Sequence, residues 1–94
     1  MSILSGTFAS NTQSSAIKLS EAYGKDGIHS LYAKGTWDTG SVKVQVSPNG
    51  TDWFDLPGAS LSADGVFNFA TRGLELRLDF SGGNGSEDVE YWVW

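Results

Sequence analysis

The single histidine of the chain, His29, is the residue whose type most readily suggests catalysis. A Ser-His-Asp hydrolase needs a nucleophile beside such a histidine, and the sequence holds neither a Gly-x-Ser-x-Gly nucleophile motif nor a cysteine. His29 also alternates with Ile28 and Ser30 in a segment that is typical of a strand. We therefore expect His29 to be a packing or surface residue, and we expect no hydrolase chemistry of this type.

Carboxylates are the next candidates, because a glycosidase needs two of them facing one cleft. A chain of 94 residues has little room for a deep cleft, and most of its carboxylates fall in predicted turns or on a predicted solvent face. Two turns could instead offer oxygens to calcium, but neither matches an EF-hand loop, and turn chemistry explains both. We expect no enzyme activity and no cofactor. The catalytic candidates are Asp52, Asp55, Asp64, Asp79, Glu87, Asp88 and Glu90; the calcium candidates are Asn49, Asp52 and Asp55 in one turn and Asn84, Ser86, Glu87 and Asp88 in the other.

Large aromatic residues gather at the C-terminal end. Alternation along Val89–Trp94 places Trp92 and Trp94 with Glu90 on one face of a strand, and valine and tyrosine on the other. Trp and Tyr are enriched at protein contacts, and exposed apolar patches are usually functional. Two interpretations follow: one face is an interface, or the strand is central and buried on both sides.

Composition narrows the possible partners. The chain has 11 acidic and 6 basic residues and a net charge of −5, so its surface repels nucleic-acid backbones and anionic membranes on average. The absence of cysteine excludes disulfides and thiolate metal sites. Stability must therefore come from packing, either within the chain alone or also against other subunits.

The elements that would position these residues are strands. Ser41–Leu56 predicts a β-hairpin, because alternating valines are followed by the turn residues Ser-Pro-Asn-Gly-Thr and then by Trp53 and Phe54. Pro57-Gly58 is a second strong turn signal, and no segment has sustained helical spacing. We predict a single antiparallel β-sandwich, jelly-roll-like, of about seven or eight strands. The expected strands are Ala16–Ser20, Ile28–Lys34, Val42–Val46, Trp53–Leu56, Val66–Ala70, Leu74–Phe80 and Val89–Trp94.

Residues 1–15 are small and polar, with Ile3, Leu4 and Phe8 as isolated apolar positions. We interpret this segment as an extended N-terminal arm and residues 16–94 as the β-sandwich domain. Such an arm is disordered when free or lies along a neighbouring subunit through those three anchors.

From Gly35 onward the chain resembles a group of small tailed-bacteriophage proteins. The resemblance rests on GTW-x-x-GSVKVQVSPNGTDWFDL, then LSADGVFNF, then LELRLDFSGGNGS. In that group an alternating strand, a Ser-Pro-Asp/Asn-Gly turn and a Trp precede an Asp-Gly hairpin, an Arg-bearing strand and a Gly-rich loop. It covers about two-thirds of the chain and concerns pattern rather than a catalytic motif. It implies a β-sandwich component of the virion, assembled in the host cytoplasm.

Two functional hypotheses follow. The first is a capsid decoration protein that stabilises the head shell by binding the major capsid protein and copies of itself, as a trimer or another small oligomer. Its contact residues would be Ile3, Leu4, Phe8, Trp37, Trp92 and Trp94. The second is a carbohydrate-binding module or an adaptor or tail-fibre component, in which Trp37 and Trp53 stack on sugar rings. Neither hypothesis involves nucleic acid or a membrane.

Overall fold

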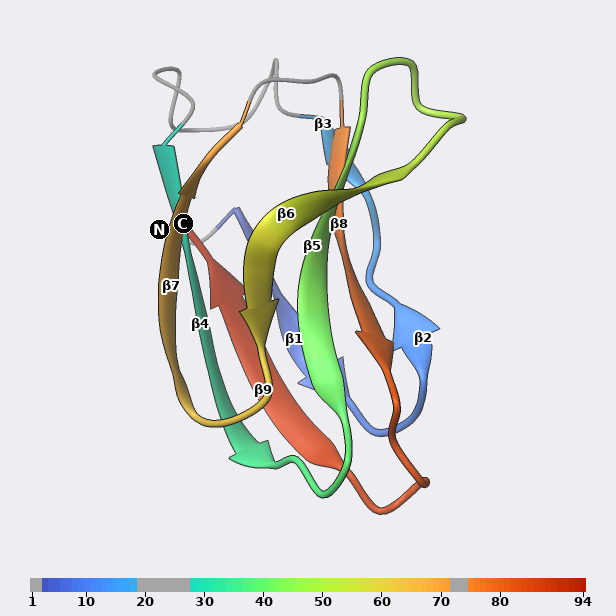
Figure 1. Cartoon of the computed structure of the whole chain (residues 1–94), viewed down its shortest axis with the longest axis vertical. Helices are drawn as coiled ribbons and strands as arrows, with labels where there is room; N and C mark the ends of the chain where they lie inside the picture. The colour runs from blue at the N-terminus through green and yellow to red at the C-terminus, as the bar shows by residue number, and fades with distance from the viewer. Residues whose placement is uncertain (1–2, 19–27, 72–74) are drawn as a thin grey trace.

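The computed structural model describes residues 3–18, 28–71 and 75–94, which form two packed antiparallel sheets (Figure 1). Sheet A has the strand order β1-β9-β4-β7, and sheet B has the order β2-β8-β5-β6, with β3 also paired to β8. The all-β sandwich predicted from the sequence is therefore confirmed. The strands are β1 Leu4–Phe8, β2 Thr12–Gln13, β3 Ile17–Lys18, β4 Ile28–Thr36, β5 Ser41–Ser47, β6 Phe54–Leu61, β7 Gly65–Ala70, β8 Glu75–Ser81 and β9 Asp88–Val93.

The strand order is that of a jelly roll, which can be described as one long hairpin wound around itself. Its successive pairs are β5 with β6, β4 with β7, β2 and β3 with β8, and β1 with β9. Winding then pairs β4 with β9 and β5 with β8, which closes the two sheets. The two ends of the hairpin consequently lie together, and the Ile3 amide donates to the Val93 carbonyl at 2.7 Å.

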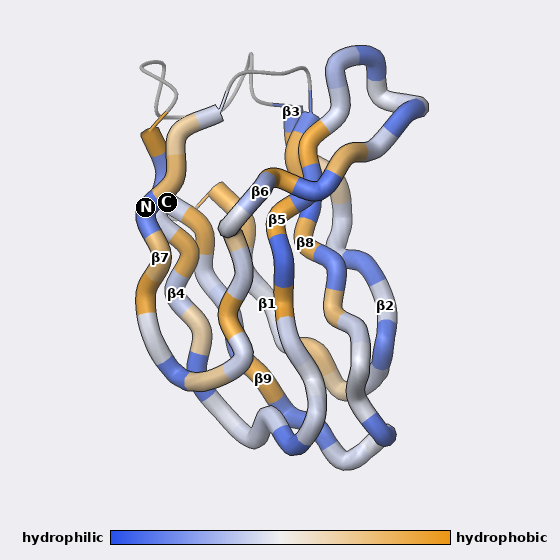
Figure 2. Tube along the Cα trace, in the orientation of Figure 1, coloured by the Kyte–Doolittle hydropathy of each residue, from blue (hydrophilic) through white to orange (hydrophobic). Residues whose placement is uncertain are grey.

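The core lies between the sheets and is supplied by alternate residues of each long strand, as the hydropathy colours in Figure 2 show for β5 and β8. Val42 and Val44 of β5 are fully buried, as are Leu76 and Leu78 of β8. Lys43, Gln45 and Arg77 occupy intervening positions and are half-buried on the outer side of the sheet. Alternation along the sequence predicts that these valines and leucines face the core, and this is confirmed for the described residues, which do not include Leu74. On the opposite side the prediction of solvent exposure is wrong for Ser47, which is fully buried, and for Asp79, which is 8% exposed.

Pro57-Gly58 does not form the turn that the sequence predicts. Both residues lie inside β6, where the pairing with β5 shifts from Gln45 opposite Asp55 to Lys43 opposite Ser60. The extra β6 residues form a bulge, which tolerates a proline because its missing N–H is not needed for pairing. Gly58 supports the bulge with a φ of 76°.

The N-terminal segment also differs from the expected arm. Leu4–Phe8 is β1, an edge strand of sheet A, and Phe8 is 2% exposed. The Phe8 ring stacks on Tyr91 with a centroid distance of 4.6 Å and on Phe80 at 5.3 Å. Because Phe8 fills the core, it is not available as an anchor for a neighbouring subunit.

Glu87 organises the turn between β8 and β9. Its carboxylate accepts hydrogen bonds from the backbone amides of Asn84 at 2.7 Å and Gly85 at 3.0 Å, and the residue is 4% exposed. The amide of Asn84 is the largest of the influences that hold the pKa of Glu87 below its ordinary value. The carboxylate therefore stabilises this turn in its ionised form.

This linkage predicts acid sensitivity. Since the folded chain holds Glu87 at a lower pKa than the unfolded chain does, the unfolded chain takes up the proton first as the pH falls. The contribution of ionised Glu87 to folding stability is complete above the ordinary glutamate pKa of 4.5. It is lost as the pH drops through the lower pKa that Glu87 has in the folded chain. We expect the melting temperature of the wild-type chain to fall between about pH 6 and about pH 3. The melting temperature of Glu87→Gln should fall less steeply over the same range. Parallel slopes for the two proteins would contradict this role.

Candidate interaction surface

The outer face of sheet A carries most of the large apolar side chains that the described part of the chain leaves exposed. Ile28 is 61% exposed, Val66 52%, Trp94 47% and Tyr32 43%, and Trp92 beside them is half-buried. We call these five residues the aromatic face. Exposed apolar patches on a monomer are uncommon and usually serve contacts, so this face is the strongest candidate site.

Strand register brings the aromatic face together from three strands. Tyr32 of β4 lies opposite Trp92 of β9 on one side and opposite Val66 of β7 on the other. Trp94 lies beside Ser30, with which it exchanges two backbone hydrogen bonds of 2.9 and 3.3 Å. The two tryptophans are adjacent on one face because they are two residues apart in an extended strand.

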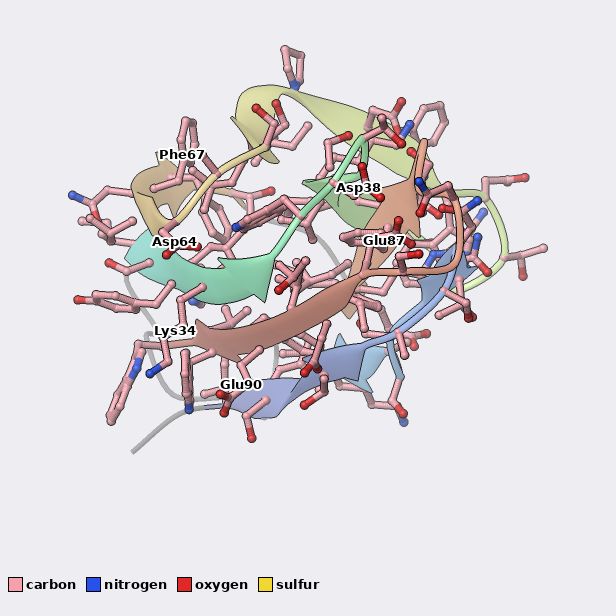
Figure 3. All side chains as sticks on the ribbon, turned by 90° about the horizontal axis from the view of Figure 1, so that it is seen from below. Lys34, Asp38, Asp64, Phe67, Glu87 and Glu90 are labelled. Carbon is pink, nitrogen blue, oxygen red and sulfur yellow. The ribbon has the colours of Figure 1, made fainter. Side chains whose placement is uncertain are left out.

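The three aromatic rings Tyr32, Trp92 and Trp94 line an open pocket of about 380 Å³. Beside it, Lys34 lies opposite Glu90, and Figure 3 shows both side chains on the side of sheet A that faces away from sheet B. Within the described residues, neither side chain makes a hydrogen bond or an ion pair. On the same face Ser30 donates to Asn68 at 2.7 Å. This face therefore combines flat apolar rings with one internal polar pair and with the charges of Lys34 and Glu90.

The outer face of sheet B is more polar, and its charged and amide groups form a network of contacts with one another. Gln45 donates to Asp55 at 2.8 Å, and Lys43 bridges Asp55 at 3.2 Å and Asp79 at 3.8 Å. Gln13 donates to Asp79 at 2.8 Å. The hydrogen bond from Gln45, with a smaller contribution from Lys43, lowers the pKa of Asp55. A face whose polar groups are already paired offers little to a partner.

Trp53 belongs to this second, polar face. The Arg77 guanidinium lies over its ring, 4.2 Å from the centroid, and donates through Nε to Gln45 at 2.8 Å. A cation placed over the ring is an attractive contact that occupies the stacking surface. Trp53 is therefore a poor platform for a sugar ring, contrary to the carbohydrate hypothesis drawn from the sequence.

Trp37, the other tryptophan proposed to stack on sugar or contact a capsid, is buried at 8% exposure. Its indole Nε1 donates to Asp64 at 2.8 Å, and the Gly35 amide donates to the same carboxylate oxygen at 2.9 Å. The bond from Trp37 is the largest cause of the lowered pKa of Asp64. Trp37 thus joins two loops of the sandwich and does not present its ring to a ligand.

The remaining predicted contact residues divide between the core margin and the aromatic face. Ile3 and Leu4 are half-buried against the core, whereas Trp92 and Trp94 lie on the aromatic face. The sequence pattern predicts these two tryptophans but not Ile28, Tyr32 and Val66, which join them only through strand pairing. The alternation along Ile28–Lys34 was the available signal.

His29 and the carboxylate and amide residues of the turn at Asn49 are engaged in packing and in turn hydrogen bonds. His29 is 3% exposed, stacks on Phe69 and has its Nδ1 3.1 Å from the Trp94 carbonyl oxygen. Asn49 Oδ1 accepts the amides of Thr51 and Asp52 at 2.9 Å. Across residues 3–18, 28–71 and 75–94 there is no group of three or more His, Asp or Glu side chains suited to a metal ion.

Comparison with protein-family models, curated proteins and solved structures finds no match for this chain. The described residues also include no helix of the length and hydropathy needed to cross a membrane. The two outer faces of the sandwich and the sequence pattern are therefore the features that bear on function.

Proposed function

We propose that this chain is a non-enzymatic structural protein of a bacteriophage virion that decorates and stabilises the capsid, and that it docks on the major capsid protein through the aromatic face. The contrast between the two outer faces carries the docking part of the proposal. One face exposes Tyr32, Trp92 and Trp94 beside Lys34 and Glu90, which make no hydrogen bond or ion pair within the described residues. On the other face hydrogen bonds link Gln45 to Asp55 and Arg77 to Gln45. The virion part depends on the resemblance from Gly35 onward.

The chemistry of the aromatic face fits a protein partner. Tryptophan and tyrosine are the residues most often responsible for binding energy at interfaces, especially where they are surrounded by a polar rim. Trp92 and Trp94 occupy the apolar centre here, and Lys34 and Glu90 lie beside them. Lys34 and Glu90 carry opposite charges, so the face can match a capsid surface of mixed charge.

A glycan is the second candidate partner, and the pocket lined by Tyr32, Trp92 and Trp94 favours it. Sugars present apolar C–H faces that pack on aromatic rings, and hydroxyl groups that bond to polar side chains at the rim. Under this alternative the chain is a carbohydrate-binding or tail-fibre component. The sugar would then stack on these three residues rather than on Trp37 and Trp53.

Binding of the purified wild-type chain to two targets separates these functions. The targets are empty shells assembled from the major capsid protein of the same genome, measured by co-sedimentation, and an array of bacterial surface glycans. We expect saturable binding to shells and none to glycans. Glycan binding without shell binding would replace decoration with the carbohydrate function, and binding to neither target would contradict both.

A further inference from the structure

The edges of the two sheets are protected to different degrees against pairing with another chain. In sheet B, β2 and β3 have two residues each, and β6 carries Pro57 and a bulge. Short strands, proline and bulges are the usual devices that prevent an edge from adding a further strand. Sheet B is therefore closed to extension at both edges.

The β7 edge of sheet A has none of these devices. Its sequence, Gly-Val-Phe-Asn-Phe-Ala, has no charge and no proline and is rich in residues that favour strands. Among the described residues β7 pairs only with β4. Val66 is 52% exposed and Phe67 is half-buried at this margin. Such an edge is suited to pairing with another strand.

The direction of the free backbone groups follows from the pairing of β4. Ser30 exchanges backbone hydrogen bonds with Trp94, so its amide and carbonyl point toward β9. Backbone direction alternates along a strand, and the groups of Leu31 consequently point toward Phe67 of β7.

By the same alternation, the amides and carbonyls of Val66, Asn68 and Ala70 point away from β4 toward the open side. Asn68 is the middle one of these three residues. An antiparallel strand centred on Asn68 would therefore provide hydrogen-bond partners for the free backbone groups of all three residues.

We propose that two copies of this chain pair through their β7 edges, antiparallel and centred on Asn68, so that sheet A continues from one copy into the next. In a two-fold contact both copies present the same edge, so a charge near the axis would lie close to the identical charge of the other copy. The β7 edge has no charge, whereas β6 has Asp55 and β3 has Lys18.

The β1 edge is also uncharged, but it is a weaker candidate. Its strand has five residues, and Ser5 and Thr7 are the polar residues at the positions that correspond to the apolar Val66 and Ala70 of β7. Pairing through β7 also joins the aromatic faces of the two copies into one surface. The dimer does not depend on a virion role and would stand if shell binding failed.

The test uses a cysteine at the two-fold axis, because the wild-type chain has none. Hydrogen-bonded partners in an antiparallel pair lie about 5.5 Å apart between Cα atoms, which is within disulfide range. We expect Asn68→Cys to form a covalent dimer under mild oxidation, and Ser5→Cys on β1 to remain largely monomeric. Equal crosslinking of both variants would overturn the proposal.

Sedimentation equilibrium provides the second measurement. We expect the wild-type chain to sediment at twice the chain mass at about 100 µM, and Asn68→Lys to raise the dissociation constant at least about tenfold because two lysines then meet at the axis. The matched control is Ser5→Lys, which should dimerise like wild type. A wild-type monomer, a trimer, or a dimer unaffected by Asn68→Lys would overturn the proposal.

Discussion

Phe8→Ala will destabilise the fold by about 3–5 kcal/mol, the range for removing a large aromatic ring from a packed core. Phe8 is 2% exposed and stacks on both Tyr91 and Phe80. Its loss leaves a cavity between the two sheets and weakens the attachment of β1 to β9. In a domain of this size the melting temperature should fall by at least about 12 °C.

The matched control is Ser5→Ala, three residues earlier in the same strand and exposed to solvent. Surface substitutions of this kind change stability by about 0.5 kcal/mol or less. Similar melting temperatures for Phe8→Ala and Ser5→Ala would show that β1 is not part of the folded core. They would favour the interpretation of residues 1–15 as an extended arm.

Gly35→Ala is expected to have the second largest effect on stability. Gly35 lies opposite Val89 in the β4–β9 pairing and has a φ of 143°. An added Cβ would collide with the backbone carbonyl oxygen of Asp88, which cannot move without breaking the pairing of the two strands. The clash and the backbone strain together should cost about 3 kcal/mol or more.

Gly58→Ala provides the control, since Gly58 also has a positive φ, of 76°, but no atom lies within 4 Å of an added Cβ. It should cost only the backbone term of about 1–2 kcal/mol. Thermal unfolding of both variants measures the difference. Equal losses would mean that the contact with Asp88 does not limit this position.

The sequence predicts the parts of the fold that local alternation determines. Val42 and Val44 were assigned to the core because every second residue of the strand is apolar, and the same pattern assigned Leu76 and Leu78. The faces of β9 were also predicted correctly. Alternation does not predict whether another part of the chain covers the face that carries Trp92 and Trp94. That depends on which elements pack beside the sheet.

Features that depend on distant partners were not predictable. The strand β1 has a weak pattern because Gly6 stands at an inward position. An added Cβ there would meet the Tyr91 hydroxyl at 2.6 Å, so the position must be small to admit a ring from another strand. Trp37 is buried because Asp64, 27 residues away, accepts its indole hydrogen bond. Neither relationship has a local signal.

The aromatic face also combines features that local geometry determines with features that depend on distant partners. Trp92 and Trp94 share a face because of local strand geometry, and the sequence reveals that. Tyr32 and Val66 join them through the register of β4 with β9 and β7, which only the folded sheet determines. The polar closure of sheet B likewise depends on pairings between Gln45, Asp55 and Arg77 that come from three strands.

The most direct test of the docking role is the affinity for capsid shells of a Trp92→Ser/Trp94→Ser double variant, measured by co-sedimentation. The control is Phe54→Ser, which removes a side chain that is 58% exposed but lies outside the aromatic face. Two tryptophan contacts at an interface centre predict at least a 100-fold loss for the double variant, to an order of magnitude, with the thermal stability largely kept. The control should bind like wild type. Unchanged shell binding by the folded double variant would contradict docking through the aromatic face.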